Sequence, residues 1–258
     1  MEARESHVQS VSRALKLMTI LGKSSRGMRV SDLARESGLA VSTTHRLLTT
    51  LENDEFVHFD HGQREWHVGR EAFAVGANYL QKRSYVAPGM GQLRRLRDAT
   101  KETANLGCLE DGQLVTLGQA ESREIMRAIS PPGGRVPATC SAMGKALLAT
   151  WPDTEIDRFI TRHGFTALTA RSITDPASFW SEIAEIRHSG FAVDDEEHAR
   201  DLRCIGAAVL GPSGEAIAAI SVSGIAQRVT RERIQTVANK VMTAASQLSL
   251  RIGGQKRL

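Results

Sequence analysis

The sequence predicts an α+β fold in two parts: an N-terminal winged helix-turn-helix and a C-terminal domain with a mainly antiparallel sheet flanked by helices. Short helical patterns follow one another early in the chain and end at two alternating runs typical of a hairpin. Strand patterns joined by tight turns, at Asp111–Gly112 and Pro212–Gly214, later alternate with helical patterns. A length of 258 residues suits two ordinary domains.

Composition favours a globular cytoplasmic protein. Hydrophobic residues make up 41% of the chain, enough for a substantial core. No apolar run approaches the ~20 residues that cross a bilayer, and the N-terminus mixes acids with bases, unlike a secretory signal. Cys108, Cys140 and Cys204 are far apart and odd in number, so neither a disulfide framework nor a structural zinc site is expected.

Positive charge is concentrated at the N-terminus. The chain carries +4 overall, and residues 1–50 alone hold eight bases against four acids, which again gives +4. Such a bias is the electrostatic footprint expected of a domain that binds a polyanion, although a solvated surface is the alternative. The eight bases are Arg4, Arg13, Lys16, Lys23, Arg26, Arg29, Arg35 and Arg46.

The first fifty residues predict a helix and then a helix-turn-helix. Apolar residues recur at helical spacing between Val8 and Met18, and Gly22 stops the pattern. After a polar loop, Ser31 is expected to cap a short helix that ends at Gly38.

The next helical pattern, residues 43–56, has two chemically different faces, and Ser42 is expected to cap it. One face is formed by Thr44, Leu47, Leu48 and Leu51. The opposite face and its flanks carry Ser42, Thr43, His45, Arg46, Thr49 and Thr50. We expect the leucine face to pack on the preceding helices and the polar face to meet a DNA groove.

Alternating runs at 56–59 and 65–68 flank a turn at 60–62 and predict a β-hairpin, the wing of a winged helix domain at residues 1–69. Residues 70–84 predict a linker helix anchored by Phe73 and Leu80.

Residues 85–258 predict a second domain. Helical patterns cover 89–103, 140–151 (starting near Ser141), 175–190 and 231–252, the last capped by Thr230. Strand patterns cover 104–111, 113–121, 123–130, 191–198 and the hairpin 204–224, while 131–137 is expected to be a rigid loop. The hairpins make the sheet mainly antiparallel.

The order of these segments resembles the IclR family of bacterial transcriptional regulators over nearly the whole chain. The resemblance is carried by SVSRALKLMTIL, LARESGLAVSTTHRLLTTLE, CSAMGKALLA, VDDEEHARDLRCIGAAV and AIAAISVSG. Within the family the chain is most similar to glyoxylate-responsive repressors of allantoin-utilisation genes, which also carry EEH, a Cys–Ile pair and AISISG. The resemblance implies a winged helix domain, a GAF-like effector domain, dimers or tetramers, and a small organic acid as signal.

Six side chains are candidate DNA contacts: Arg13, Ser42, Thr43, His45, Arg46 and Arg64. At the start of a recognition helix, Ser42 and Thr43 suit phosphates or base edges, with capping as the alternative. Arg46 suits a guanine edge or a phosphate, and the other two arginines suit phosphates. One such module binds weakly, so a homodimer or homotetramer on a palindromic operator is expected. The linker helix and the effector domain are both candidate dimer surfaces.

The candidate effector site begins with two serines. Ser221 and Ser223 alternate in one strand, so both hydroxyls lie on the same face, where they suit a carboxylate. Backbone N–H groups near Ala142 and Met143, at a helix start, favour the same anion.

By resemblance, Asp194 and Cys204 complete the pocket and hold the aldehyde end of the ligand. Met143 departs from the small residues of the glyoxylate-responsive relatives at this helix start, so the expectation from the residues is a small carboxylate. The alternatives without a ligand-binding role are that Cys204 is simply a small buried hydrophobic residue and that the acidic run is a solvated loop.

The sequence therefore favours a ligand-responsive repressor that is not an enzyme and uses no cofactor or metal. Two alternative functions remain. A metal-responsive regulator would use Asp194, Glu197 and His198 as ligands. A cysteine-dependent enzyme would use Cys204 and His198, but the chain lacks a GxSxG elbow and a dinucleotide glycine pattern.

Overall fold

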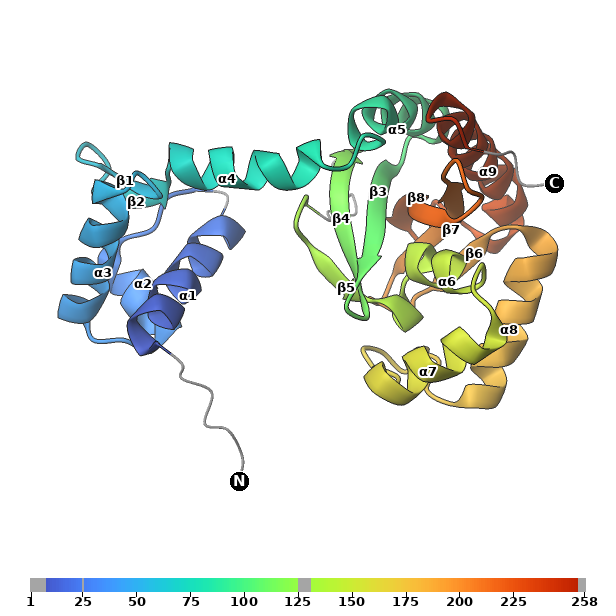
Figure 1. Ribbon diagram of the computed structural model, residues 1–258, viewed down its shortest axis with the longest axis horizontal. Coiled ribbons are helices and arrows are strands. Elements are labelled where there is room, and N and C mark those ends of the chain that lie inside the picture. Colours follow the sequence, from blue (N-terminus) through green and yellow to red (C-terminus); the bar gives the residue numbers. More distant parts are fainter. Residues whose placement is uncertain (1–7, 25, 125–130, 255–258) are drawn as a thin grey trace. The chain divides into compact units, whose positions relative to one another are not determined.

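The computed structural model describes residues 8–24, 26–124 and 131–254 (Figure 1). The chain folds into two compact units, residues 1–82 and 83–258. The strand predicted at 123–130 falls almost entirely outside the described residues. Within the described ranges, no helix is both long enough and apolar enough to span a bilayer.

The first unit is built from helices α1 (Gln9–Lys23), α2 (Val30–Ser37) and α3 (Val41–Asn53). Their apolar faces and the wing share a core that includes Leu17, Leu21, Leu33, Leu48, Val57 and Trp66. In α3, Thr44 and Leu48 are fully buried, and Leu47 and Leu51 pack at the edge of the same core. The apolar face predicted for this helix is therefore confirmed.

The helix caps predicted in this unit are wrong. α2 begins at Val30 and α3 at Val41, each two residues earlier than expected, and neither start has a side-chain cap. Ser31 and Ser42 lie instead in the first turns, where Ser42 is exposed. Gly38 ends α2 as predicted, because the left-handed conformation there (φ 71°) costs little without a Cβ.

The hairpin forms as expected from β1 (Val57–Asp60) and β2 (Glu65–Val68), which pair antiparallel. The Asp60 carboxylate accepts hydrogen bonds from the backbone N–H groups of Gly62 (2.8 Å) and Gln63 (3.1 Å), which shapes the turn. The backbone N–H of Phe59 donates to Glu52 of α3 (3.0 Å), so the wing is tied to that helix. Helix α4 (Arg70–Gln81) follows and buries no residue. Phe73 is 75% exposed, so it does not anchor the helix within the chain as predicted.

The second unit is organised around a six-stranded antiparallel sheet of the described residues, in the order β5-β4-β3-β8-β7-β6. β8, the last strand in the chain, lies between β3 and β7. The rigid loop predicted at 131–137 in fact contains the short strand β5. The strands are β3 (Thr103–Glu110), β4 (Gln113–Ala120), β5 (Arg135–Pro137), β6 (Ala192–Asp195), β7 (Leu202–Leu210) and β8 (Ala216–Ile225).

Helices cover both faces of this sheet (Figure 1). Leu106 of β3 lies against Gly89 of α5, whereas the next residue, Gly107, faces Met143 of α6. Because alternate residues of a strand point to opposite faces, these helices lie on opposite sides. This is the GAF-like arrangement that was expected. The helices are α5 (Val86–Thr100), α6 (Ala142–Leu148), α7 (Asp153–His163), α8 (Pro176–Ser189) and α9 (Ile234–Arg251).

Three local features of this unit test the sequence predictions. Ser141 caps α6 as expected, since its hydroxyl accepts from the N–H of Gly144 (3.3 Å). Thr230 does not cap the terminal helix: a 3-10 turn at Arg231–Arg233 intervenes, and α9 begins at Ile234. Helix α7 was not predicted, because its pattern is short and mostly polar.

Candidate functional sites

The polar face of α3 borders a groove of about 510 Å³ on the first unit. Four of the six predicted DNA contacts line it: Arg13, Thr43, His45 and Arg46. Ser42 is exposed on the same helix outside the groove. Arg64 stands apart at the hairpin tip, with φ 57°.

The three arginines predicted to contact DNA are not neutralised by ion pairs within the described protein. Within the described ranges, Arg13, Arg46 and Arg64 take part in no ion pair with a carboxylate. His45 is less free, because its ring meets the Trp66 ring edge-on at 6.2 Å. The arginines therefore suit contacts with phosphates or base edges.

A small pocket of about 90 Å³ lies in the second unit, and all six predicted effector residues line it: Ala142, Met143, Asp194, Cys204, Ser221 and Ser223. The sheet brings the last four together. Asp194 of β6 lies opposite Cys204 of β7, which lies opposite Ser223 of β8. Ala142 and Met143 come from the first turn of α6.

Gly206 allows α6 to approach the sheet at this pocket. A Cβ at this position would lie 2.8 Å from the backbone C of Ala142 and 2.8 Å from the backbone N of Met143. Side chains do not tolerate such distances, so only glycine lets the start of α6 lie directly on β7.

The Asp194 side chain forms a buried acidic wall of the pocket. It is 1% exposed, and its Oδ1 accepts backbone N–H bonds from Glu197 (2.8 Å) and His198 (3.2 Å). Burial raises the pKa of this carboxyl above its usual value despite those bonds. Burial also raises the pKa of the Cys204 thiol well above normal, with Asp194 and Ser223 in contact with it.

Three polar pocket residues were missed by the sequence analysis as effector contacts: Asn105, Ser141 and His198. Asn105 of β3 lies opposite Ser221. A polar amide inside a largely apolar strand pattern was the available signal, since asparagine is depleted in strands.

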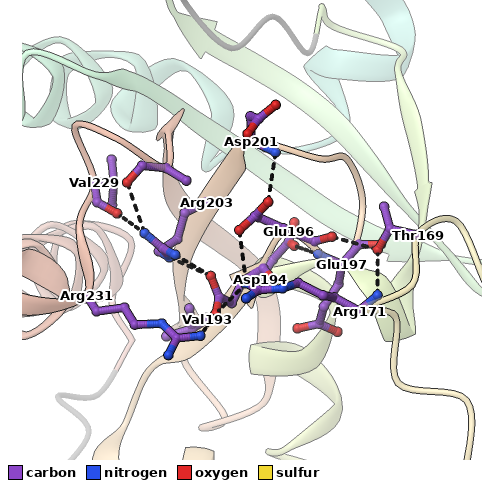
Figure 2. A network of polar contacts seen from close by, with 12 residues as sticks. Thr169, Arg171, Val193, Asp194, Glu196, Glu197, Asp201, Arg203, Val229 and Arg231 are labelled. Atoms are coloured by element: carbon purple, nitrogen blue, oxygen red, sulfur yellow. Dashed lines mark hydrogen bonds and ion pairs between the residues drawn. The ribbon is translucent and has the colours of Figure 1, made fainter.

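The loop after Asp194 is tied down by arginines (Figure 2). Asp195 pairs with Arg203, with Arg231 (2.8 Å) and with Arg171 (3.0 Å). Arg171 also pairs with Glu196 (2.9 Å). These contacts connect the loop to the start of the last helix and to residues 169–172, and they fix the pocket wall.

The buried side chain of Lys145 on α6 also contacts the loop that follows Asp194. It is fully buried, and its Nζ donates to Glu182 (2.8 Å), to Glu197 (2.5 Å) and to the carbonyl of Val193 (2.6 Å). Burial raises the pKa of Glu197 to about 7. Its second carboxylate oxygen is buried and has no hydrogen-bond partner among the described residues.

These pairings leave the acidic loop poorly suited to a metal ion. Asp195, Glu196 and Glu197 pair with arginine or lysine side chains, and Asp194 accepts two backbone N–H bonds. No group of three or more His, Cys, Asp or Glu able to hold a metal occurs among the residues that the structure places.

Comparisons with known proteins agree with the fold of both units. The helix-turn-helix model of the IclR family matches residues 10–61, and the model described as "Bacterial transcriptional regulator IclR C-terminal" matches residues 77–250. The transcriptional repressor IclR of Escherichia coli is 35% identical over 96% of this chain and 92% of its own length.

The transcriptional repressor AllR of Klebsiella pneumoniae is 34% identical over 95% of this chain and 90% of its own length. The crystal structure of Thermotoga maritima IclR superposes with a TM-score of 0.81 at 24% identity, covering 96% of this chain and all of that one. The chain belongs to the IclR family of bacterial transcriptional regulators.

Proposed function

We propose that this protein is a repressor that binds a palindromic DNA operator and changes its operator affinity when a small carboxylate or oxoacid, such as glyoxylate, binds the second unit. The observation that carries the proposal is the small pocket lined by Asp194, Ser221 and Ser223, in a unit distinct from the one that carries α3. Because its target is bacterial DNA, we place the protein in the cytoplasm.

For DNA, we assign α3 to the major groove and the hairpin to the flanking backbone. Arg46 contacts a guanine edge or a phosphate. Thr43 and Ser42 contact phosphates or base edges, while Arg13 and Arg64 contact phosphates. His45 borders the groove and adds a polar contact.

For the effector, size and polarity both favour a short acid. The pocket volume of about 90 Å³ is well below the roughly 150 Å³ of a cavity that holds benzene. Ser221, Ser223 and the first-turn N–H groups of Ala142 and Met143 supply donors for a carboxylate. Asp194 needs a donor in return, and the hydroxyl of a hydrated aldehyde would provide it.

Met143 closes one side of this pocket. It is 5% exposed and belongs to an apolar cluster with Leu114, Leu147 and Ala219. The long side chain therefore limits ligand length and leaves room for the carboxylate. This supports an acid of two or three carbons.

A homodimer or homotetramer is part of the proposal. α4 exposes Phe73 (75%) on one side, and Val75 (58%) with Tyr79 (38%) on another, so apolar side chains are present for a second copy to cover. Two α3 helices spaced by about 34 Å would then meet successive major grooves of a palindrome.

The mechanism is thermodynamic linkage. An acid that prefers one arrangement of the effector units shifts the spacing of the two DNA-binding units, and this changes operator affinity. A coupling free energy of ~1–3 kcal/mol gives a several-fold to ~100-fold change.

A cysteine-dependent enzyme is disfavoured by the environment of Cys204. A nucleophilic thiol needs a lowered pKa, whereas burial raises the pKa here. A metal-responsive regulator is disfavoured because Glu197 is engaged by Lys145.

The test is a thermal-shift screen with glyoxylate, pyruvate, glycolate, oxalate, succinic semialdehyde and allantoate. A ligand that binds only the folded protein raises Tm by mass action. We expect a shift confined to short acids, followed by release of DNA fragments selected from a random library. A panel without any shift would reject the effector assignment, and failure to enrich any DNA would reject the operator assignment.

A further inference from the structure

The orientation of the two pocket hydroxyls is set by one amide on the neighbouring strand β3. Asn105 is 1% exposed, and its Nδ2 donates to the Oγ of Ser221 (3.4 Å) and to the Oγ of Ser223 (3.1 Å). Its Oδ1 accepts from the Nε2 of Gln119 on β4 (3.0 Å). Hydrogen bonds therefore run in one direction, from β4 through β3 to β8.

The direction of these hydrogen bonds determines whether the two serine hydroxyls act as donors or as acceptors toward a ligand. An amide nitrogen only donates, and a hydroxyl has one hydrogen and two lone pairs. Because both serine oxygens accept from Asn105, each hydroxyl keeps its hydrogen for another partner. In the described part of the chain, the further polar contact recorded for these hydroxyls is that of Ser223 with the Cys204 thiol, a weak acceptor.

We propose that Asn105 is a positioning residue that makes the pocket selective for a deprotonated carboxylate over its neutral amide. This inference rests on the proposed effector site and adds the source of its selectivity. With their oxygens engaged by Asn105, the hydroxyls of Ser221 and Ser223 present two donors to one ligand group. A carboxylate offers two charged oxygens to them, whereas an amide offers one neutral oxygen and its NH₂ would meet donors with a donor.

Asp194, two strands away on β6, has the reverse polarity. Its Oδ1 accepts two backbone N–H bonds, and an ionised carboxylate can only accept from a ligand. A ligand with an acceptor group at one end and a hydroxyl at the other satisfies both walls. This is the chemistry of a short 2-hydroxy acid or a hydrated 2-oxo acid.

The first variant is Asn105→Asp, which keeps the shape and reverses the hydrogen bonds but also places a negative charge beside an anionic ligand. A carboxylate only accepts, so the two serines would donate to it and turn their lone pairs toward the pocket. Gln119→Glu makes the same reversal from outside the pocket, so a loss of acid preference in both variants assigns the effect to the hydrogen bonds. We would measure Kd by calorimetry for two matched pairs, glycolate with glycolamide and pyruvate with pyruvamide. At pH 8 we expect the acids to weaken by at least ~10-fold and the amides to change by less than ~3-fold.

A pH series separates this role from simple packing. Lowering the pH protonates the introduced carboxyl, which then donates again, so acid binding by Asn105→Asp should recover. The matched control Asn105→Ala removes the amide without reversing polarity, so it should weaken acid and amide alike with no recovery at low pH.

Gln119→Glu is a second variant at a half-buried position outside the pocket. The new carboxylate accepts from the Asn105 amide, whose oxygen then turns to the serines. The acid-to-amide preference should fall as in Asn105→Asp, which keeps the inference testable if Asn105→Asp does not fold.

The outcomes distinguish the two proposals. If the wild-type protein binds neither acid, the proposed effector class is wrong and this inference falls with it. If the wild-type protein binds an acid but both reversing variants keep its acid-to-amide preference, the effector site stands and the role of Asn105 is refuted.

Discussion

Arg46 shows how a single residue is placed for contact with another molecule. Leu48, two positions further along α3, is fully buried, so the helix is anchored by one face while Arg46 stands on the other in solvent. In the described part of the chain the Arg46 guanidinium has no ion-pair partner. Nothing in the fold requires its charge.

We therefore expect Arg46→Ala to reduce specific operator affinity by roughly 5- to 150-fold, the ~1–3 kcal/mol of a good base contact. Tm and the ligand-induced shift should stay unchanged. Arg94→Ala removes the same charge from an exposed position in the second unit and should leave operator affinity intact. Fluorescence anisotropy with the selected operator measures both, and equal losses would contradict the assignment of α3.

The raised pKa of the Glu197 carboxyl predicts that the stability of the fold depends on pH. Its pKa, raised by burial to about 7, lies above the ~4.3 of an unfolded glutamate, so the native state binds more protons between these values. Its contribution to stability therefore falls as pH rises through that window. Glu197→Gln mimics the protonated form and should be more stable than wild type by ~1–3 kcal/mol at pH 8, with little difference at pH 4.5.

Urea unfolding at pH 4.5 to 8 measures this difference, with Glu185→Gln on the exposed face of α8 as the control. A stability difference that did not change with pH would mean that the Lys145 contact keeps Glu197 ionised in the native state.

Sequence patterns identified the residues whose chemistry is visible in a short stretch. Ser221 and Ser223 could be predicted because alternation in one strand puts both on one face. Asn105 and Lys145 could not, because their roles depend on partners far along the chain: Asn105 bonds Ser223, and Lys145 bonds Glu197. A fully buried lysine is not expected without its partner.

At the scale of elements, the contact between α6 and β7 controls the pocket. Gly206→Ala would place a methyl group 2.8 Å from the α6 backbone, so α6 must shift. We expect loss of ligand binding and a destabilisation of ~1–3 kcal/mol. Gly91→Ala, where α5 has open space, should keep ligand binding. Calorimetry and thermal unfolding report both effects, and full ligand binding by Gly206→Ala would refute the tight contact.

Helix α4 is the element whose surface suggests assembly. We expect Phe73→Ser to raise the dissociation constant of the oligomer by ~30-fold or more, as for a central interface residue worth about 2 kcal/mol. Leu168→Ser, at a partly exposed leucine of the second unit, should have no such effect. Sedimentation velocity over a dilution series distinguishes them, and unchanged assembly in Phe73→Ser would move the interface elsewhere.

The element predictions failed where local rules compete. Ser31 and Ser42 have side chains that favour caps, yet the helices start two residues earlier, a difference of the size by which helix ends commonly vary. α7 was missed because few of its residues are apolar, and it is held by Ile156 and Phe159 in the core it shares with α8.

At the scale of the whole molecule, thermodynamic linkage makes the effects of acid and operator on each other's affinity equal. If an acid lowers operator affinity by some factor, saturating operator must lower affinity for that acid by the same factor. Ser221→Ala with Ser223→Ala should keep operator affinity and abolish this effect. Titrating the acid with and without operator measures the factor, and unequal factors would mean that the acid acts outside the binding equilibrium.

The central place of β8 has a consequence for synthesis of the chain. The first unit is complete at residue 82, whereas the pocket needs Ser221 and Ser223 from the last strand, inserted between β3 and β7. At 5–20 residues per second, roughly 7 to 30 seconds separate the two events on the ribosome. The N-terminal unit of a nascent chain can thus fold before the effector pocket exists. A transcript broken before β8 would encode a regulator that cannot bind the acid.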